Sequence, residues 1–292
     1  MDDELLRYLY QRLIRSASGS STRGCKFADG VIALIYFLAV LSDRSPRWAA
    51  DKRNWPLWLR RVLPCPSYSQ LIRRLKSVAV ERLIAQINGE LRDRLPRSGL
   101  KCCDGKALVV GGFSKDPDAH RGKIPDGWGR GYKLHVIVDS LGAIETFAIT
   151  PLNSGEATVA RKLVGPLDLR GTVMRADANY DSNALYAAVA ARGGRLLATR
   201  RKPGRGLGHG AHHPDRLRAV AELEGDPAQL KAHLRERACV ERHLGHLTNL
   251  PFGLSPLPNF VRRLRRVSLW ALAKNTLYHL HANLRLPNAK AA

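Results

Sequence analysis

The chain has 292 residues, with 48 Lys and Arg against 25 Asp and Glu, so its formal net charge is +23 at pH 7. Its hydrophobic content of 45% is enough for a real core, and its length suits one large domain or two of ordinary size. Such an excess of positive charge excludes a neutral or acidic surface and predicts binding to polyanions, although a ribosomal or merely basic protein would share this composition.

Cysteine usage and hydropathy argue against a secreted or membrane-spanning protein. The five cysteines are odd in number and include no Cys-x-x-Cys pair, so they do not form the disulfide framework of a secreted domain. The most apolar segment, 31–41, has 11 residues, whereas a helix that crosses a bilayer needs about 20. The N-terminus is acidic and lacks the basic start of an export signal. We therefore expect a cytoplasmic protein without membrane contact.

The first 98 residues have the pattern of an all-helical region. Apolar residues recur at helical spacing in 4–15, and the apolar run 31–41 is typical of a buried helix. Ser67 and Gln70 stand at the spacing of a capping box, which predicts that a long helix begins at Ser67. The inner side of this helix is expected to carry Leu71, Leu75, Val78, Leu83 and Ile87, and its outer side Arg73, Arg74 and Lys76.

A change of pattern after the breaker run 95–99 marks a second domain, 99–292, beside a helical DNA-binding region, 1–98. The expected strands are 100–105, 132–139, 143–150, 172–176 and 195–199, and the expected helices are 154–164, 181–191, 229–247 and 260–284. The stretch at about 200–228 is rich in Arg, Gly and His, which predicts a small, exposed basic insertion. This alternation predicts an α/β fold, a mixed sheet with helices on both faces.

Three acidic residues stand where a metal site could be built. Asp104 lies in the first expected strand, and Asp177 directly follows a short apolar run, where α/β sheets place reactive groups. Glu241 lies on an expected helix, one turn after Arg237. Mg²⁺ and Mn²⁺ take oxygen ligands, and two such ions about 3.5–4 Å apart can activate a nucleophile and stabilise a leaving oxygen in phosphodiester cleavage. Because 25 acidic residues offer many such triples, the motifs around these three residues must show whether they form a metal site.

Those motifs resemble the DDE transposases of bacterial insertion sequences, whose catalytic domain is RNase H-like. Cys-Asp-Gly-Lys at 103–106 resembles the first-aspartate motif, Gly-Tyr-Lys-Leu-His at 131–135 resembles the G-Y-K-x-H strand, and Asp-Ala-Asn-Tyr-Asp at 177–181 resembles the second-aspartate motif D-x-G-Y-D. Arg237 and Glu241 supply the R-x3-E core of the motif Y-x2-R-x3-E-x6-K. The resemblance covers nearly the whole chain.

The resemblance implies a transposase that cuts the ends of an insertion sequence and joins them to target DNA. Asp104, Asp177 and Glu241 would hold two Mg²⁺ or Mn²⁺ ions, and Arg237 would orient a phosphate or a carboxylate. The partner would be double-stranded DNA, both the element ends and the target. On that DNA the protein would be a homodimer or a higher oligomer, associated with the bacterial nucleoid.

Three positions depart from the family pattern. Leu234 stands for the Tyr and Thr248 for the Lys of the last motif, two residues that are thought to position DNA in the family. Asn179 stands for Gly, a mild change because Asn tolerates the left-handed turn that Gly would supply. These departures leave two alternatives open: a decayed transposase that binds DNA without catalysis, and a simple RNase H-like nuclease.

Spacing alone leaves other assignments open. Arg237 and Glu241 could form an ordinary surface ion pair, which at i, i+4 contributes roughly 0.2–0.5 kcal/mol. Cys239, His243 and His246 share a helix face and could hold zinc, although no fourth ligand is evident.

Clustered basic residues predict the DNA footprint, because Lys and Arg contacts to phosphates release counterions. The residues predicted to bind DNA are Arg73, Arg74, Arg200, Arg201, Lys202, Arg242, Arg262 and Arg263. The helix from Ser67 could enter the major groove as a recognition helix or merely pack on the catalytic domain. Asp139 and Glu145, which flank the expected hairpin 132–150, are predicted to be solvated.

Overall fold

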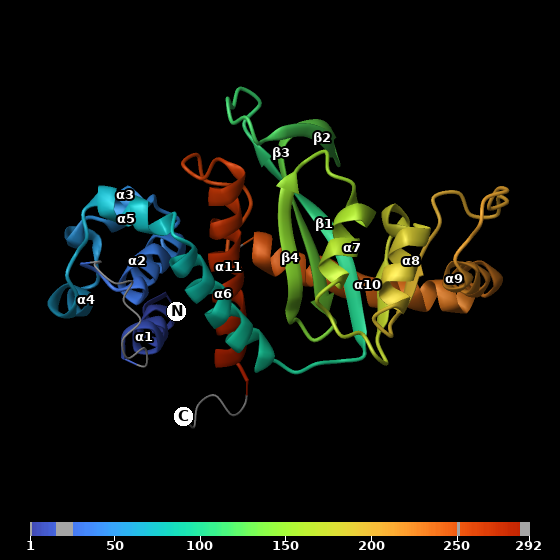
Figure 1. The fold of residues 1–292 in the computed structure, drawn as a ribbon, viewed down its shortest axis with the longest axis horizontal. Helices are drawn as coiled ribbons and strands as arrows, with labels where there is room; N and C mark the ends of the chain where they lie inside the picture. The colour runs from blue at the N-terminus through green and yellow to red at the C-terminus, as the bar shows by residue number, and fades with distance from the viewer. Residues whose placement is uncertain (1, 16–25, 250–251, 287–292) are drawn as a thin grey trace. The chain divides into compact units, whose positions relative to one another are not determined.

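The computed structural model describes residues 2–15, 26–249 and 252–286 (Figure 1). The chain divides into two compact units, one of residues 1–94, 258–261 and 265–292 and the other of residues 95–257 and 262–264. The first boundary lies close to the expected one, whereas the C-terminal helix belongs to the N-terminal unit and not to the expected domain 99–292. Within the described ranges, no helix is both long and apolar enough to cross a membrane.

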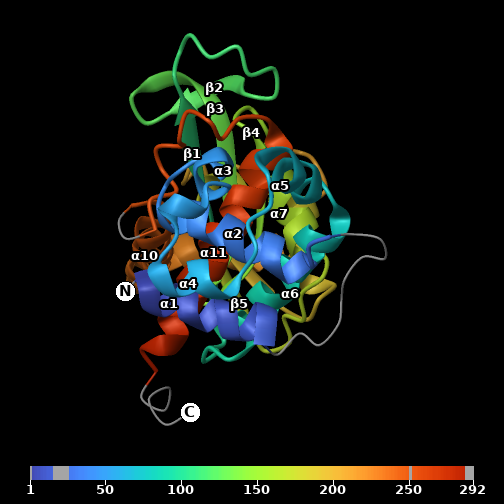
Figure 2. The same ribbon diagram turned by 90° about the vertical axis from the view of Figure 1, so that its left-hand side faces the viewer.

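The N-terminal unit is built around one apolar helix, α2. Its helices are α1 (Asp2–Tyr10), the π-helical turn η1 (Gln11–Arg15), α2 (Asp29–Leu41), α3 (Pro46–Ala49), the 3₁₀ turn η2 (Lys52–Asn54), α4 (Leu57–Val62), α5 (Tyr68–Leu75), α6 (Val78–Asp93) and α11 (Leu264–Leu284). Twelve of the thirteen residues of α2 are buried. Figure 2 shows α2 among α1, α3, α5 and α6. A helix that is apolar all round must be covered on every side, as the sequence predicts for 31–41.

The long helix expected from Ser67 is two helices. The capping box at its start is confirmed, because Ser67 Oγ accepts from Gln70 N–H and the Gln70 side chain accepts from Ser67 N–H. A second cap, Ser77, accepts from Val80 N–H and starts α6. The restart rotates the buried face, so Val78 is 57% exposed. The buried apolar side chains of α6 are Val80, Ile84, Ile87 and Leu91.

The C-terminal helix α11, expected at 260–284, is largely buried. Lys274 Nζ lies 2.6 Å from an Asp43 carboxylate oxygen, and His279 Nδ1 lies 3.0 Å from Asn88 Oδ1. Asn283 donates to the carbonyl of Leu91 at 2.7 Å. Because these three buried polar side chains have partners, they can lie in the core of the N-terminal unit.

The second unit contains a six-stranded mixed sheet, which confirms the expected α/β fold class with a mixed sheet. Its strands are β1 (Leu100–Val110), β2 (His120–Ile124), β3 (Gly127–Asp139), β4 (Ile144–Pro151), β5 (Val173–Ala176) and β6 (Arg195–Ala198). Antiparallel pairs join β2 to β3, β4 to β3 and β3 to β1, whereas β1, β5 and β6 run parallel. The sequence predicted every strand except β2.

Helices cover both faces of this sheet (Figure 1). They are α7 (Glu156–Val164), α8 (Asn183–Ala190), α9 (Pro214–Gly225) and α10 (Pro227–Thr248), with a 3₁₀ turn, η3 (Ala178–Tyr180), after β5. Cys103, Met174 and Ala176 face the core under α7, α8 and α9. Their neighbours Cys102 and Arg175 contact α10 on the opposite face. Because side chains alternate along a strand, Asp104 also leaves β1 on the α10 face.

Only the first half of the expected insertion at about 200–228 is a loop. Residues 201–213 contain no helix or strand, but α9 follows directly. Its Ala219 and Leu223 are 1% and 4% exposed and belong to the core. Charged residues on its outer face concealed this short apolar stripe in the sequence. His213, the N-cap, and Pro214, the first helical residue, mark the start of α9.

Candidate active site

Asp104 lies on β1, and Asp177 directly follows the neighbouring parallel strand β5. In the register between β1 and β5, Cys102 stands opposite Arg175, so positions 104 and 177 continue the same alignment. Parallel strands are about 4.8 Å apart, which brings the two carboxylates together. β5 ends at Ala176, and Asp177 caps the turn η3 by accepting from Asn179 N–H at 2.8 Å. Asp104 accepts from Gly105 N–H at 2.7 Å.

The surroundings of this pair disfavour negative charge. Burial raises the pKa of Asp104 to about 6, and the nearby Asp177 and Glu156 carboxylates raise it too, while the Gly105 N–H and Arg237 oppose them. Burial also raises the pKa of Asp177, with Glu156 adding to the effect and the Asn179 N–H opposing it. Two neighbouring carboxylates with raised pKa values form a site that a divalent cation would stabilise.

Helix α10 places Arg237 between two carboxylates. Its guanidinium lies 4.0 Å from Asp104 and 3.3 Å from Glu241. The Glu241 side chain is 62% exposed, while those of Asp104 and Arg237 are 19% and 21% exposed. The structure therefore brings Asp104, Asp177 and Arg237 together and leaves Glu241 at the solvent side of Arg237.

The carboxylates fit a hard cation in part. The Asp104 and Asp177 oxygens are the ligand type that Mg²⁺ and Mn²⁺ take, and the raised pKa values mark an uncompensated negative charge. Among the described residues, however, no three His, Cys, Asp or Glu side chains lie close enough to form a metal site. For Glu241 to complete the predicted set of three metal ligands, its exposed side chain must leave Arg237 and bind the ion.

Sequence reasoning missed Glu156, the first residue of α7. It pairs with Lys133 at 2.7 Å, its side chain is 13% exposed, and it raises the pKa values of both aspartates. Lys133 of the G-Y-K-x-H strand therefore faces a carboxylate within the site. The position of Glu156 at a helix start, after Gly155, was the one signal available in the sequence.

The zinc alternative finds no support among the described residues. Cys239 Sγ lies 3.3 Å from Cys102 Sγ, on the inner side of α10. His243 Nε2 lies 3.3 Å from the carbonyl of Ser140, and His246 is exposed. The three residues have separate partners, and no metal-binding group of His, Cys, Asp or Glu occurs there in the described chain.

The prediction that Asp139 and Glu145 are solvated is wrong. Their side chains are 0% and 3% exposed, and Lys101 Nζ lies 3.2 Å from Asp139 and 2.6 Å from Glu145. Ser98 N–H also donates to Asp139, and Arg97 pairs with Glu145. Hairpin ends are usually exposed, but here Lys101 of β1 and Arg97 of the segment before it supply the cations.

The predicted DNA-binding residues fall into two groups. Arg73, in the N-terminal unit, is exposed, but Arg74 is 9% exposed, pairs with Asp29 and donates to the carbonyl of Phe27 at 2.9 Å. Arg74 is therefore a core residue and not on the outer side as predicted. In the second unit, Arg201, Lys202, Arg242 and Arg263 are exposed and Arg200 and Arg262 are half-buried.

The two departures in the last motif have different surroundings. Leu234 is 49% exposed, in a position where a ring could reach a ligand. Thr248 is fully buried, and its hydroxyl donates to the carbonyl of Leu244 at 2.7 Å. A lysine in place of Thr248 would be buried, which is costly for a charged group. The change from Lys to Thr therefore does not simply remove a charge from an exposed position.

Comparisons with known proteins identify the family of this chain. The family model described as "Transposase DDE domain" matches residues 98–280. A search of solved structures gave piggyBac transposase in a synaptic complex with hairpin DNA, determined by cryo-EM, with a TM-score of 0.42 and 12% identity over 95% of this chain and 72% of that chain. A search of curated proteins gave no match. Because the family model spans well over half of the chain, including Asp104, Asp177 and Glu241, this protein belongs to the DDE transposase family.

Proposed function

We propose that this transposase cuts the ends of a bacterial insertion sequence and joins the freed 3′-hydroxyls to target DNA, by cut-and-paste or a related route. The observation that carries the proposal is the pair Asp104 and Asp177, two carboxylates with raised pKa values, one on β1 and one at the end of the adjacent strand β5, with Arg237 4.0 Å from Asp104. In a chain of net charge +23, this local concentration of negative charge is suited to a cation that also meets phosphate.

The proposed roles follow from the positions of the side chains. Asp104 and Asp177 would hold two Mg²⁺ or Mn²⁺ ions together with Glu241, whose exposed side chain would turn inward when DNA and metal are bound. When bound, such ions activate water or a hydroxyl and stabilise the leaving oxygen of an in-line displacement. Arg237, released from Glu241, would hold a phosphate through its planar guanidinium.

The exposed cations would bind the substrate. Arg201, Lys202, Arg242 and Arg263 would contact phosphates of double-stranded DNA, which supply affinity but no sequence information. Joining two element ends to one target requires two active sites, so we propose a homodimer or a higher oligomer on DNA, associated with the nucleoid.

DNA that flanks the coding region, incubated with the full chain and Mg²⁺, tests the proposal. We expect cleavage at inverted repeats and joined products with a target plasmid. Asp104→Ala, Asp177→Ala and Glu241→Ala should each abolish cleavage and leave DNA binding intact, because each removes a predicted metal ligand. Asp168→Ala is the matched control, since Asp168 is exposed and pairs with Arg170 on the surface.

The same assay separates the alternatives. Cleavage without joined products would identify a nuclease, and binding without cleavage by the wild type would identify a DNA-binding protein without catalysis. Full activity of Glu241→Ala would remove Glu241 from the site and make Glu156 the third carboxylate to test.

A further inference from the structure

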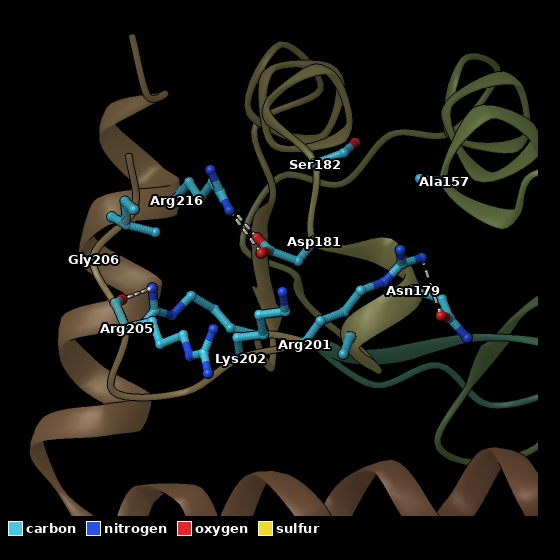
Figure 3. Close-up of a pocket in the computed structure, with 12 residues that line it drawn as sticks. Ala157, Asn179, Asp181, Ser182, Arg201, Lys202, Arg205, Gly206 and Arg216 are labelled. Carbon is cyan, nitrogen blue, oxygen red and sulfur yellow. Dashed lines mark hydrogen bonds and ion pairs between the residues drawn. The ribbon is translucent and has the colours of Figure 1, made fainter. Parts of the chain in front are cut away.

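A cavity of about 620 Å³ lies at the carboxyl ends of β5 and β6, against the turn η3 that Asp177 caps (Figure 3). Its walls come from α7, η3, the start of α8, the loop after β6 and α9. The charged side chains that line it are Arg200, Arg201, Lys202, Arg205 and Arg216, against one acid, Asp181. This excess of cations points to an anionic ligand.

Two of the five cations are already neutralised. Arg216 holds Asp181 through two hydrogen bonds of 2.7 and 2.8 Å (Figure 3), and Arg200 pairs with Glu224 of α9, with one bond of 2.6 Å. For Arg201, Lys202 and Arg205, the described part of the chain provides no carboxylate partner. The two ion pairs fix the walls of the cavity, and the other three cations leave it with a net positive charge.

Asn179 connects this cavity to Asp177. Its backbone N–H donates to one Asp177 carboxylate oxygen at 2.8 Å, and its side-chain amide lies 3.4 Å from the other. Arg201 donates to Asn179 Oδ1 at 3.3 Å (Figure 3). The glycine of the family motif has no side chain to make either amide contact, so the chain Arg201–Asn179–Asp177 depends on this departure from the motif.

Asn179 and Arg201 also belong to a second cavity of about 560 Å³. Its other cations are Lys106, Lys123 and Lys133, of which Lys133 pairs with Glu156. A DNA strand that passes Asp104 and Asp177 would therefore meet cationic side chains on both sides of the Asn179–Arg201 contact.

We propose that the larger cavity binds a DNA phosphate close to the one that reacts, through Arg201, Lys202 and Arg205, and that Asn179 is a positioning residue that couples this phosphate to Asp177. DNA as the source of the phosphate rests on the proposed function. Each strand carries one phosphate per about 3.4 Å of helix axis, so a group held next to Asp177 lies within a few nucleotides of the cleaved bond.

Binding without metal tests the phosphate site, whether or not the protein cleaves. Duplexes of the element end carry one uncharged methylphosphonate at successive positions around the predicted cleavage site. We expect the wild type to lose roughly tenfold in affinity at one or two positions, the size of a charged hydrogen bond. The double variant Arg201→Ala/Lys202→Ala should bind unmodified DNA more weakly than the wild type. A methylphosphonate at the sensitive positions should not weaken its binding further. The slope of log affinity against log salt concentration should be smaller by about 0.9 per lost phosphate contact.

The control is Arg192→Ala, an exposed arginine at the end of α8, before β6 and away from the cavity. This variant should lose affinity at the same methylphosphonate positions as the wild type. The same positional loss in Arg201→Ala/Lys202→Ala as in the wild type would overturn the phosphate site. Displacement of an unmodified duplex by millimolar inorganic phosphate from the wild type but not from this double variant would show a free-phosphate site, and would overturn the DNA assignment.

Asn179→Ala tests the coupling. This variant should bind unmodified DNA as the wild type does, but cleave it at least about tenfold more slowly, and the effect of the sensitive methylphosphonate on cleavage should shrink. Unchanged cleavage would remove the positioning role. If the wild type does not cleave at all, the proposed function fails, while the binding experiment still decides the phosphate site.

Discussion

Two groups of carboxylates lie next to β1, one around Lys101 and the other at Asp104, three residues further along the strand, and their charges are compensated to different extents. Asp139 and Glu145 surround the ammonium of Lys101, with Arg97 beside them, so their charges are matched by cations. Asp104 and Asp177 lie near each other and near Glu156; Lys133 pairs with Glu156 at 2.7 Å, but Arg237 approaches Asp104 only to 4.0 Å. The first cluster fixes the end of the sheet, whereas the second holds unmatched charge ready for a cation.

Breaking the matched cluster should have the largest effect on stability. Lys101→Ala leaves two buried carboxylates with one partial partner and should lower the free energy of unfolding by about 3–5 kcal/mol. Urea denaturation followed by far-ultraviolet circular dichroism measures this change. Lys162→Ala, on the exposed side of α7, should shift it by less than about 0.5 kcal/mol. Equal shifts for the two variants would show that the Lys101 cluster is not a structural element.

Removing the charge of Asp104 should, in contrast, raise the free energy of unfolding. Asp104 titrates near pH 6 in the folded protein and near its ordinary value of 3.8 when unfolded, so the native state binds the proton more tightly. Stability therefore falls as pH rises between these values, by at most about 3 kcal/mol. Asp104→Asn should stabilise the metal-free protein at pH 8 and make little difference below pH 4. A destabilised variant at pH 8 would contradict this picture.

A divalent cation should compensate the same charge. Mg²⁺ at a hundred times its dissociation constant should stabilise the wild type by about 2.7 kcal/mol at pH 8, and Asp104→Asn by much less. Because the ion needs the ionised carboxylate, this gain should shrink as pH falls through about 6. Thermal unfolding with and without Mg²⁺ at pH 5 and pH 8 provides the test, and an equal gain in both proteins would place the ion elsewhere.

The smallest effect is expected for Arg237. Its side chain is 21% exposed and its pair with Glu241 is an i, i+4 contact on a helix, worth about 0.3–0.5 kcal/mol, so Arg237→Gln should change stability little. Since Arg237 lowers the pKa of Asp104, its loss should raise that pKa and move the pH dependence of the Mg²⁺ effect upward. An unchanged midpoint would mean that Arg237 acts on Glu241 alone.

The sequence predicted the parts of the site that local signals encode. Asp104 and Asp177 were found because each lies within a motif at a strand, and parallel pairing of β1 and β5 then made them neighbours. Glu156 was missed because its approach to them depends on how α7 packs on the sheet. Arg74 was misplaced because its partner, Asp29, is 45 residues away in the chain.

Local chemistry thus determined the net charge, the capping box at Ser67, the strand and helix periods and the motifs around the aspartates, since these depend on residues within a few positions of one another. Tertiary structure alone decided which charges are buried and matched. Lys101, Asp139 and Glu145 become a core cluster because β1, β3 and β4 pair, and Asn179 meets Arg201 because β5 and β6 end at the same edge. Desolvation and charge pairing act through space, so only the folded chain separates a solvated carboxylate from a buried one.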